Sequence, residues 1–194
     1  PRGKVLGGSS SINGMIFQRG NPMDYERWGE IKGLEKWSYK YCLPYFKKME
    51  ALQQFSSEYR GDKGPLHLER GDGNNPLCKQ FLLAAEQAGY PIIEDLNGHR
   101  QEGFSHFDRN IKNGRRWSSA RAYYHPIKNR NNLTVVTKCF TTELIWEKNT
   151  IVGVRALLKG KEVTYLGSQI ILCSGAINTP KLLMLSGIGP ENHL

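Results

Sequence analysis

Apolar residues recur at helical spacing in three parts of the chain. Residues 23–29 and 38–53 are expected to form helices, the second interrupted near its start by Pro44. Residues 76–88 place most of their apolar side chains on one side and end at Gly89, which predicts an amphipathic helix. We also expect a helix over residues 119–127, with Ser118 as its cap.

Runs typical of strands dominate the rest of the pattern. Residues 66–68 predict one short strand, and residues 90–116 alternate polar and aromatic residues as the strands and loops of a sheet do. Towards the end, short apolar or β-branched runs are separated by turn residues, which predicts a meander whose last strand joins a parallel sheet. These runs are residues 133–137, 140–146, 150–157, 162–166 and 169–173.

A glycine and serine segment stands near the start of the chain. Residues 3–13 read GKVLGGSSSIN, so that two glycines precede three serines and an asparagine. Glycine lets a ligand approach the backbone closely, and the serines and Asn13 add hydrogen-bonding groups that can cap a helix. A helix that began here would direct its free N–H groups at an anion or an electron-rich ring. A plain turn or linker is the other interpretation of this segment.

A second segment of interest lies near the other end. Residues 170–190 read IILCSGAINTPKLLMLSGIGP, which predicts a buried strand, a tight turn at residues 174–176, and a helix that starts at Thr179-Pro180 and ends at Gly187. A strand that enters a helix through small residues is how doubly wound sheets bring backbone to a dinucleotide.

Composition and charge limit the classes of function that the chain can have. The 194 residues carry a net charge of +9, and 39% of them are hydrophobic, which is ordinary for a globular domain. The basic residues are dispersed, so a solvated surface explains the charge better than a nucleic-acid-binding module, which stays the alternative from another class. No apolar run is long enough for a membrane helix. The cysteines lack metal-site or disulfide spacing, which fits a reducing compartment; they are Cys42, Cys78, Cys139 and Cys173.

One pair of residues has the spacing of a metal-ligand pair. His106 and Asp108 are two positions apart, so a strand would place both side chains on one face. No third ligand lies nearby in the sequence, and loop residues or a satisfied hydrogen bond are the preferred interpretation. We therefore predict no metal site.

The two glycine-bearing segments together resemble the glucose–methanol–choline (GMC) family of FAD-dependent oxidoreductases. The first family signature is matched over residues 3–26 and the second over residues 175–189. The sequence between them, including YRGDKGPLHLERG, EDLNGHRQEGF and GRRWSSARAY, is most similar to choline dehydrogenases of that family. The resemblance covers essentially all of the chain but only about a third of such an enzyme.

The resemblance implies a mixed α/β fold that is part of a doubly wound FAD-binding domain with an inserted, incomplete substrate-binding region. Residues 1–20 and 131–194 are expected in the FAD-binding domain, residues 21–65 in a segment that covers the flavin, and residues 66–130 in the substrate-binding region. The pyrophosphate loop would precede Pro1 and the catalytic histidine would follow Leu194. We therefore treat the chain as an internal fragment, assign it no catalytic residue, and expect it to fold incompletely and bind FAD poorly alone.

The resemblance also implies where FAD would bind. The family histidine that attaches flavin covalently in some relatives corresponds to Ile12, so the FAD is expected to be non-covalent. The implied cofactor-binding residues lie in the first signature, in the strand region and at the turn of the second signature. They are Val5, Gly7, Gly8, Ser9, Asn13, Gly14, Met15 and Ile16, then Thr141, then Ser174, Gly175 and Ala176.

The implied reaction is the oxidation of a small primary alcohol, choline to betaine aldehyde, by hydride transfer to flavin. The electron acceptor is left open between a quinone, a carrier protein and oxygen. An FAD-containing hydroxynitrile lyase on the same scaffold is the alternative within the resemblance. We expect no nucleic-acid partner, and a cytoplasmic location or a peripheral one at the inner membrane.

Overall fold

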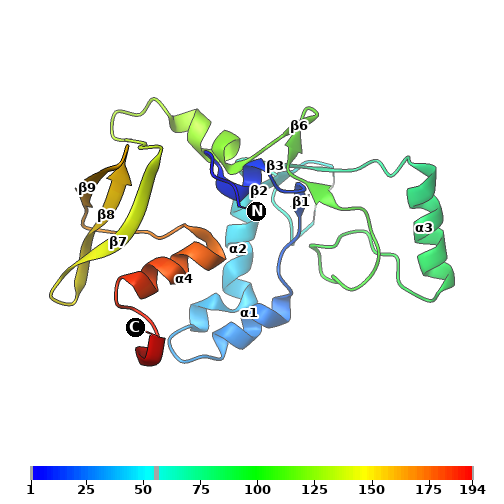
Figure 1. The fold of residues 1–194 in the computed structure, drawn as a ribbon. Helices are drawn as coiled ribbons and strands as arrows, with labels where there is room; N and C mark the ends of the chain where they lie inside the picture. Colours follow the sequence, from blue (N-terminus) through cyan, green and yellow to red (C-terminus); the bar gives the residue numbers. More distant parts are fainter. Residues whose placement is uncertain (1, 55–56, 194) are drawn as a thin grey trace. The chain divides into compact units, whose positions relative to one another are not determined.

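The computed structural model (Figure 1) describes residues 2–54 and 57–193. The chain divides into two compact units, and the boundary in the sequence lies between Arg130 and Asn131. The division falls where the sequence analysis placed the start of the second FAD-binding segment. The roles given to that segment and to the three segments before it stay predictions.

The first unit combines α-helices with short strands. Its α-helices are α1 (Pro22–Gly29), α2 (Tyr39–Met49) and α3 (Pro76–Gln87), and its strands are β1 (Ile16–Phe17), β2 (Glu50–Leu52), β3 (Leu66–Arg70), β4 (Asp108–Arg109), β5 (Ile111–Lys112) and β6 (Arg115–Arg116). Short helical turns complete it: η1 (Gly8–Ser11), η2 (Glu35–Trp37), η3 (Ala120–Tyr124) and η4 (His125–Ile127).

The sheet of the first unit has the order β1-β4-β3-β2, in which only β2 and β3 run parallel. Strands β5 and β6 form a separate hairpin. Ala51 and Leu52 of β2 and Leu68 of β3 are buried apolar residues. The short core strands therefore hold together segments that are distant in the sequence.

Local signals explain where α1 and α3 begin. Asn21 accepts a hydrogen bond from Met23 N at 2.9 Å, and Asn75 does the same for Leu77 N at 2.9 Å. Each asparagine is followed by a proline in the first helical position, which needs no N–H donor. Both helices were predicted, and both are confirmed.

The helix after Ser38 is shorter than predicted. It ends at Met49, and residues 50–52 form strand β2 instead of a last helical turn. The prediction for residues 119–127 is also only partly right. These residues form one π-helical turn and one 3₁₀ turn, and the first helical turn has no side-chain cap, so Ser118 is not the cap.

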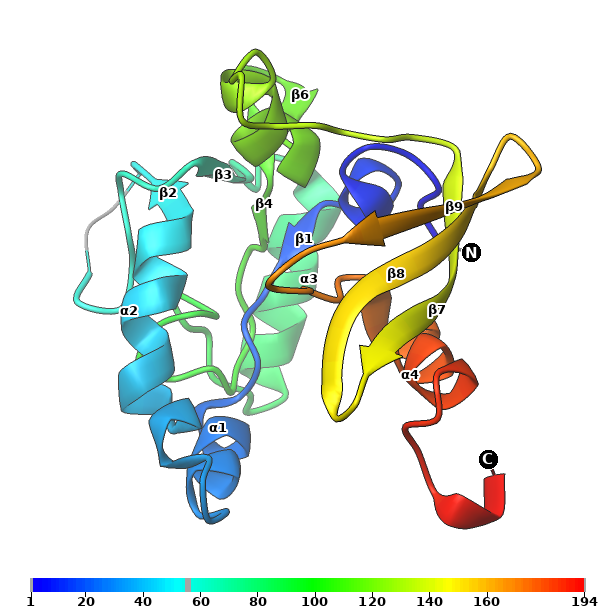
Figure 2. The same ribbon diagram turned by 90° about the vertical axis from the view of Figure 1, so that its left-hand side faces the viewer.

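The second unit is a three-stranded antiparallel meander with one helix. Its strands are β7 (Cys139–Glu147), β8 (Thr150–Leu158) and β9 (Lys161–Leu166); helix α4 (Gly175–Leu185) and the turn η5 (Glu191–His193) follow. The two turns are tight because Lys148, Lys159 and Gly160 adopt positive φ. Figure 2 shows α4 alongside β7, where Leu144 and Leu182 are buried.

Two predicted strands are absent from the described residues. Residues 133–137 and 169–173 have no assigned secondary structure and take part in no sheet, and Ile171 is 80% exposed. A strand needs a hydrogen-bonded neighbour, and neither run has one in this part of the chain. The prediction that the meander rejoins a parallel sheet is therefore not realised here. No described helix is both long and apolar enough to cross a membrane.

Candidate functional site

The glycine and serine segment folds into a compact loop rather than the start of a long helix. Gly7 and Gly8 have φ of 88° and 54°, and only a four-residue 3₁₀ turn, η1, follows. Residues with a side chain rarely adopt these angles, so glycine suits both positions of the turn. Of the two interpretations considered for this segment, a helix start and a plain turn, the single turn η1 agrees with the turn.

Serine hydroxyls hold this loop together. Ser10 Oγ donates to Gly7 O at 2.5 Å, and Ser11 Oγ donates to Leu6 O at 2.9 Å. Ser9 Oγ accepts from Gly3 N at 3.2 Å. The hydroxyls therefore serve the loop itself first, and the surfaces that remain for a ligand are the backbone, Asn13 and the glycines.

The glycines of this segment differ in what they face. A Cβ at Gly7 would lie 2.6 Å from Ser11 Oγ, so the fold itself excludes a larger residue there. Gly8 and Gly14 face open space, with no atom within 4 Å of a Cβ built on either. Gly14 also has no positive φ, so nothing in the described fold requires a glycine at that position. An open backbone of this kind fits a ligand that approaches it closely.

The end of the loop is set by Asn13 and Met15. Met15 has a φ of 67°, which is uncommon for a residue with a side chain. Its N–H donates to Asn13 Oδ1 at 3.1 Å, and its carbonyl accepts from Asn110 N at 3.0 Å. Ile16 then enters β1, where it pairs with Arg109. Asn13, Gly14 and Met15 thus form a tightly constrained turn that leads directly into Ile16 of β1.

Thr141 and Ser174 lie together in the second unit. They line one groove of about 380 Å³ between β7 and α4, with Asn178 and Lys181 from the helix. Gly175 has a φ of 89° and open space beside its Cα. Of the predicted cofactor residues in this unit, the structure brings Thr141 and Ser174 to the same groove.

The helix at the second signature begins earlier than predicted. It starts at Gly175 rather than at Thr179-Pro180, so that Pro180 lies inside the helix. Thr179 Oγ1 accepts from Ser174 N at 3.1 Å, which ties this side chain back to the residue before the helix. Gly175 and Ala176 are therefore the first two helical residues, and not a turn that precedes the helix.

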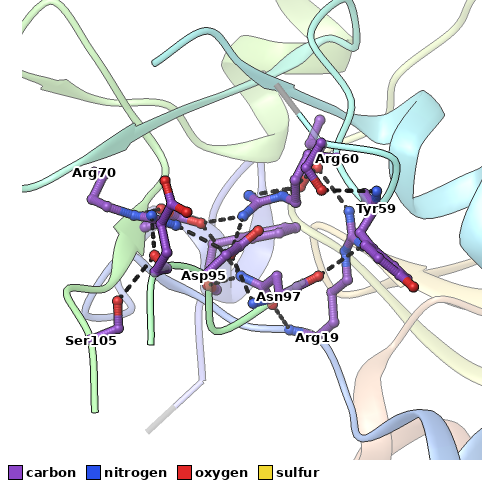
Figure 3. Close-up of polar contacts among 12 residues, drawn as sticks. Arg19, Tyr59, Arg60, Arg70, Asp95, Asn97 and Ser105 are labelled. Atoms are coloured by element: carbon purple, nitrogen blue, oxygen red, sulfur yellow. Dashed lines mark hydrogen bonds and ion pairs between the residues drawn. The ribbon is translucent and has the colours of Figure 1, made fainter. Parts of the chain in front are cut away.

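A buried cluster of charges lies next to β1, and the sequence analysis did not foresee it (Figure 3). Glu50 is fully buried and accepts from Arg19 Nη2 and from Arg60 Nε, each at 2.8 Å. Arg60 Nη1 also reaches Asp108 at 2.8 Å and Asp95 at 2.7 Å. No single stretch of sequence reveals this cluster, because its members come from five separate segments.

Arg60 stays charged because it has several acidic partners. Burial disfavours the charged form of Arg60, but its hydrogen bond to Glu50 and the charges of Glu50, Asp108 and Asp95 outweigh burial and raise its pKa. Arg19 N donates to Asn97 Oδ1 at 2.7 Å, so the cluster also fixes the chain just after β1. The cluster thus ties the chain that leaves β1 to β2 and to the segment around Asn97.

His106 and Asp108 do not form a metal-ligand pair. Asp108 is buried in the charge cluster, whereas the His106 ring lies against Gly73. Within residues 2–54 and 57–193, no group of three or more histidine, cysteine or acidic residues could hold a metal ion. The four cysteines are free thiols.

Comparisons with known proteins bear on the whole chain. The family model described as GMC oxidoreductase matches residues 1–194. The chain is 53% identical over its whole length to oxygen-dependent choline dehydrogenase of Staphylococcus xylosus and 51% identical to the protein of that name from Staphylococcus haemolyticus. It spans about a third of the length of these relatives, 35% and 34% respectively.

Solved structures give the same result for the fold. The chain superposes on pyridoxine 4-oxidase from Mesorbium loti with a TM-score of 0.91 at 32% identity, covering 98% of this chain and 38% of that one. An FAD-dependent oxidoreductase from Chaetomium thermophilum gives a TM-score of 0.90 at 26% identity, with 98% and 36% covered. The expected mixed α/β fold is confirmed, and the chain belongs to the flavin-dependent GMC oxidoreductase family.

Proposed function

We propose that this chain is part of an FAD-dependent enzyme that oxidises choline to betaine aldehyde. The observation that carries the proposal is the identity of 51–53%, over the entire chain, to proteins named oxygen-dependent choline dehydrogenase. The relatives are about three times as long as this chain, so the activity proposed is that of the full-length protein.

The residues in and just after the glycine and serine segment fit FAD. The flavin ring and the pyrophosphate are rich in hydrogen-bond acceptors, and the loop offers backbone N–H groups, the Asn13 amide and the open backbone at Gly8 and Gly14. The Ile12 side chain is hydrocarbon and 51% exposed, so it offers no atom for a covalent link. We therefore propose non-covalent binding, with contacts from the residues named in the sequence analysis.

Bound FAD would supply the hydride acceptor for the alcohol carbon. The part of this chain is to bind and orient: its donors would face the acceptor atoms of the ring, where reduction places negative charge. We assign no residue of this chain to removal of the hydroxyl proton.

Oxygen is the proposed electron acceptor. The names of the relatives include "oxygen-dependent", and one similar structure is an oxidase. A quinone or a carrier protein would be the alternative outcome. We also propose a reducing compartment, in the cytoplasm or at the inner membrane, because the four cysteines are unpaired; cell fractionation of the full-length protein would test this.

The decisive experiment is anaerobic titration of the purified full-length protein with choline. Bleaching of the flavin absorbance, with betaine aldehyde as product and recovery on admission of air, supports the proposal. The neutral isostere 3,3-dimethylbutan-1-ol is the matched control and is expected to bleach the flavin more slowly. Cyanide release from a cyanohydrin without bleaching would indicate the lyase chemistry instead. Absence of flavin from the full-length protein would overturn the proposal.

A further inference from the structure

Arg116 holds the side chain of Asn13 from outside the glycine and serine segment. Its Nη1 donates to Asn13 Oδ1 at 2.7 Å and to the carbonyl oxygen of Ser10 at 3.2 Å. Arg116 comes from the β5–β6 hairpin, about a hundred residues later in the sequence. One guanidinium nitrogen thus bridges both ends of the turn from Ser10 to Asn13.

These contacts fix the orientation of the Asn13 amide. Its Oδ1 accepts from Arg116 and from Met15 N, and both are donors that cannot reverse their role. A flipped amide would point its NH₂ group at two other donors, one of them positively charged. Nδ2 is therefore directed away from both, and within the described residues it has no hydrogen-bond partner, although the side chain is exposed.

The loop is attached to the fold without Arg116. Ser119 N donates to Ser10 Oγ at 2.9 Å, and Asn110 N donates to Met15 O at 3.0 Å. These two bonds hold the loop at Ser10 and at Met15, on either side of Asn13. What Arg116 adds is the orientation of one amide and a positive charge beside it.

We propose that Arg116 is a positioning residue that keeps Asn13 Nδ2 directed at an acceptor atom of the bound flavin. This proposal rests on the proposed function, since it takes FAD as the ligand of the first segment. An amide locked in one orientation loses no rotational freedom on binding, and its donors are already aligned with the acceptor. Arg116 itself does not touch the ligand in this proposal.

The test is a double-mutant cycle in the full-length protein, with the dissociation constant for FAD as readout. We expect Arg116→Met to weaken FAD binding about tenfold, because the Asn13 amide is then no longer held in the orientation that binding requires. In the Asn13→Leu background the same change should have no further effect, because Arg116 acts through Asn13. Arg115→Met is the matched control: it removes the same charge from the neighbouring residue, which is exposed, and should bind FAD as the wild type does.

The Asn13→Asp variant tests whether the contacts of Arg116 orient the Asn13 amide or only attach the loop to the fold. A carboxylate keeps both acceptor contacts, to Arg116 and to Met15 N, but has no N–H to offer. We expect this variant to melt at or above the temperature of the wild type, and yet to bind FAD about tenfold more weakly with an altered flavin absorption spectrum. Arg116→Lys keeps the charge and one donor, and should recover part of the affinity lost in Arg116→Met.

The outcomes are distinct. Additive effects of Arg116→Met and Asn13→Leu, or wild-type FAD affinity in Asn13→Asp, would overturn the inference while choline oxidation by the wild type stood. A wild-type protein that holds no flavin would overturn both the inference and the proposed function. If Arg116→Met fails to fold, Arg116→Lys and Asn13→Asp decide the question by the same readouts.

Discussion

Arg60 and Glu50 form a two-point ion pair from which water is excluded: Nε lies 2.8 Å from Oε1 and Nη2 lies 3.2 Å from Oε2. Both side chains are 1% exposed or less. Glu50 also accepts from Arg19 and from Gly61 N, so that one carboxylate joins β2 to the chain after β1 and to the loop before β3. Because a buried ion is stable only with its partners, loss of either member of this pair is expected to destabilise the first unit.

The first prediction is that Glu50→Gln destabilises the protein by about 3–5 kcal/mol. The change leaves Arg19 and Arg60 buried with too little negative charge around them. The control is Asp24→Asn, which removes a carboxylate from an exposed ion pair with Arg27 and should change stability by less than about 1 kcal/mol. Urea unfolding of both variants measures the difference, and equal stabilities would contradict the role given to the buried pair.

The second prediction concerns acid sensitivity at His67. Burial and the positive charge of Lys112 lower the pKa of His67 below its ordinary 6.5, and Glu69 opposes them only in part. The unfolded chain therefore takes up a proton at a higher pH than the folded one, so the neutral histidine favours folding above about pH 6.5 and this contribution is lost as the pH falls further.

Unfolding free energies measured at pH 7.5 and pH 5.5 test this contribution. His67→Gln cannot titrate and should show a smaller fall in stability between the two pH values than the wild type. Lys112→Met should show an intermediate fall, because it removes one of the charges that disfavour protonation. A wild-type fall no larger than that of His67→Gln would show that His67 does not set the acid sensitivity.

How far the sequence predicts the structure depends on how local each signal is. Helices α1 and α3 were predictable because an asparagine and a proline mark each start within two residues. The end of α2 was not, because Glu50 leaves the helix to meet Arg19 and Arg60, and neither arginine is a sequence neighbour. The β-hairpins of the second unit were predictable from their turns, whereas residues 133–137 have strand composition but no neighbouring strand among the described residues.

The same reasoning applies to the candidate site. The glycines and Asn13 could be selected from the sequence because residue types of this kind carry meaning by themselves. Arg116 lies in a stretch that resembles the family, but nothing in GRRWSS tells which arginine reaches back to Asn13. The sequence offered no signal for the pairing, because it depends on where the β5–β6 hairpin folds.

The third prediction is that Ser186→Ala loosens the contact of α4 with β7. Ser186 Oγ donates to Leu182 O at 2.7 Å and accepts from Leu144 N at 2.8 Å. Alanine would leave the buried N–H of Leu144 without its acceptor, which costs about 1–3 kcal/mol. Hydrogen exchange at Leu144 should accelerate by tenfold or more. Ser168→Ala, in the exposed loop after β9, is the control and should leave that rate unchanged.

The last prediction compares two glycines of the first segment. A Cβ at Gly3 would lie 2.1 Å from Gly8 O, so Gly3→Ala must displace the backbone of the loop and should lower both stability and FAD affinity. A Cβ at Gly14 meets nothing within 4 Å, and the φ of Gly14 is one that alanine tolerates. Gly14→Ala should therefore leave the melting temperature of the FAD-free protein within about 2 °C of the wild type.

If flavin approaches the backbone at Gly14, the added methyl group occupies space that the ring needs. We expect Gly14→Ala to weaken FAD binding at least tenfold in the full-length protein, with no change in the FAD-free state. Equilibrium titration with FAD, followed by flavin fluorescence, measures the affinity, and thermal unfolding without FAD measures the stability. Unchanged affinity in Gly14→Ala would place the flavin elsewhere, because an open glycine that tolerates a side chain is not reserved for a ligand.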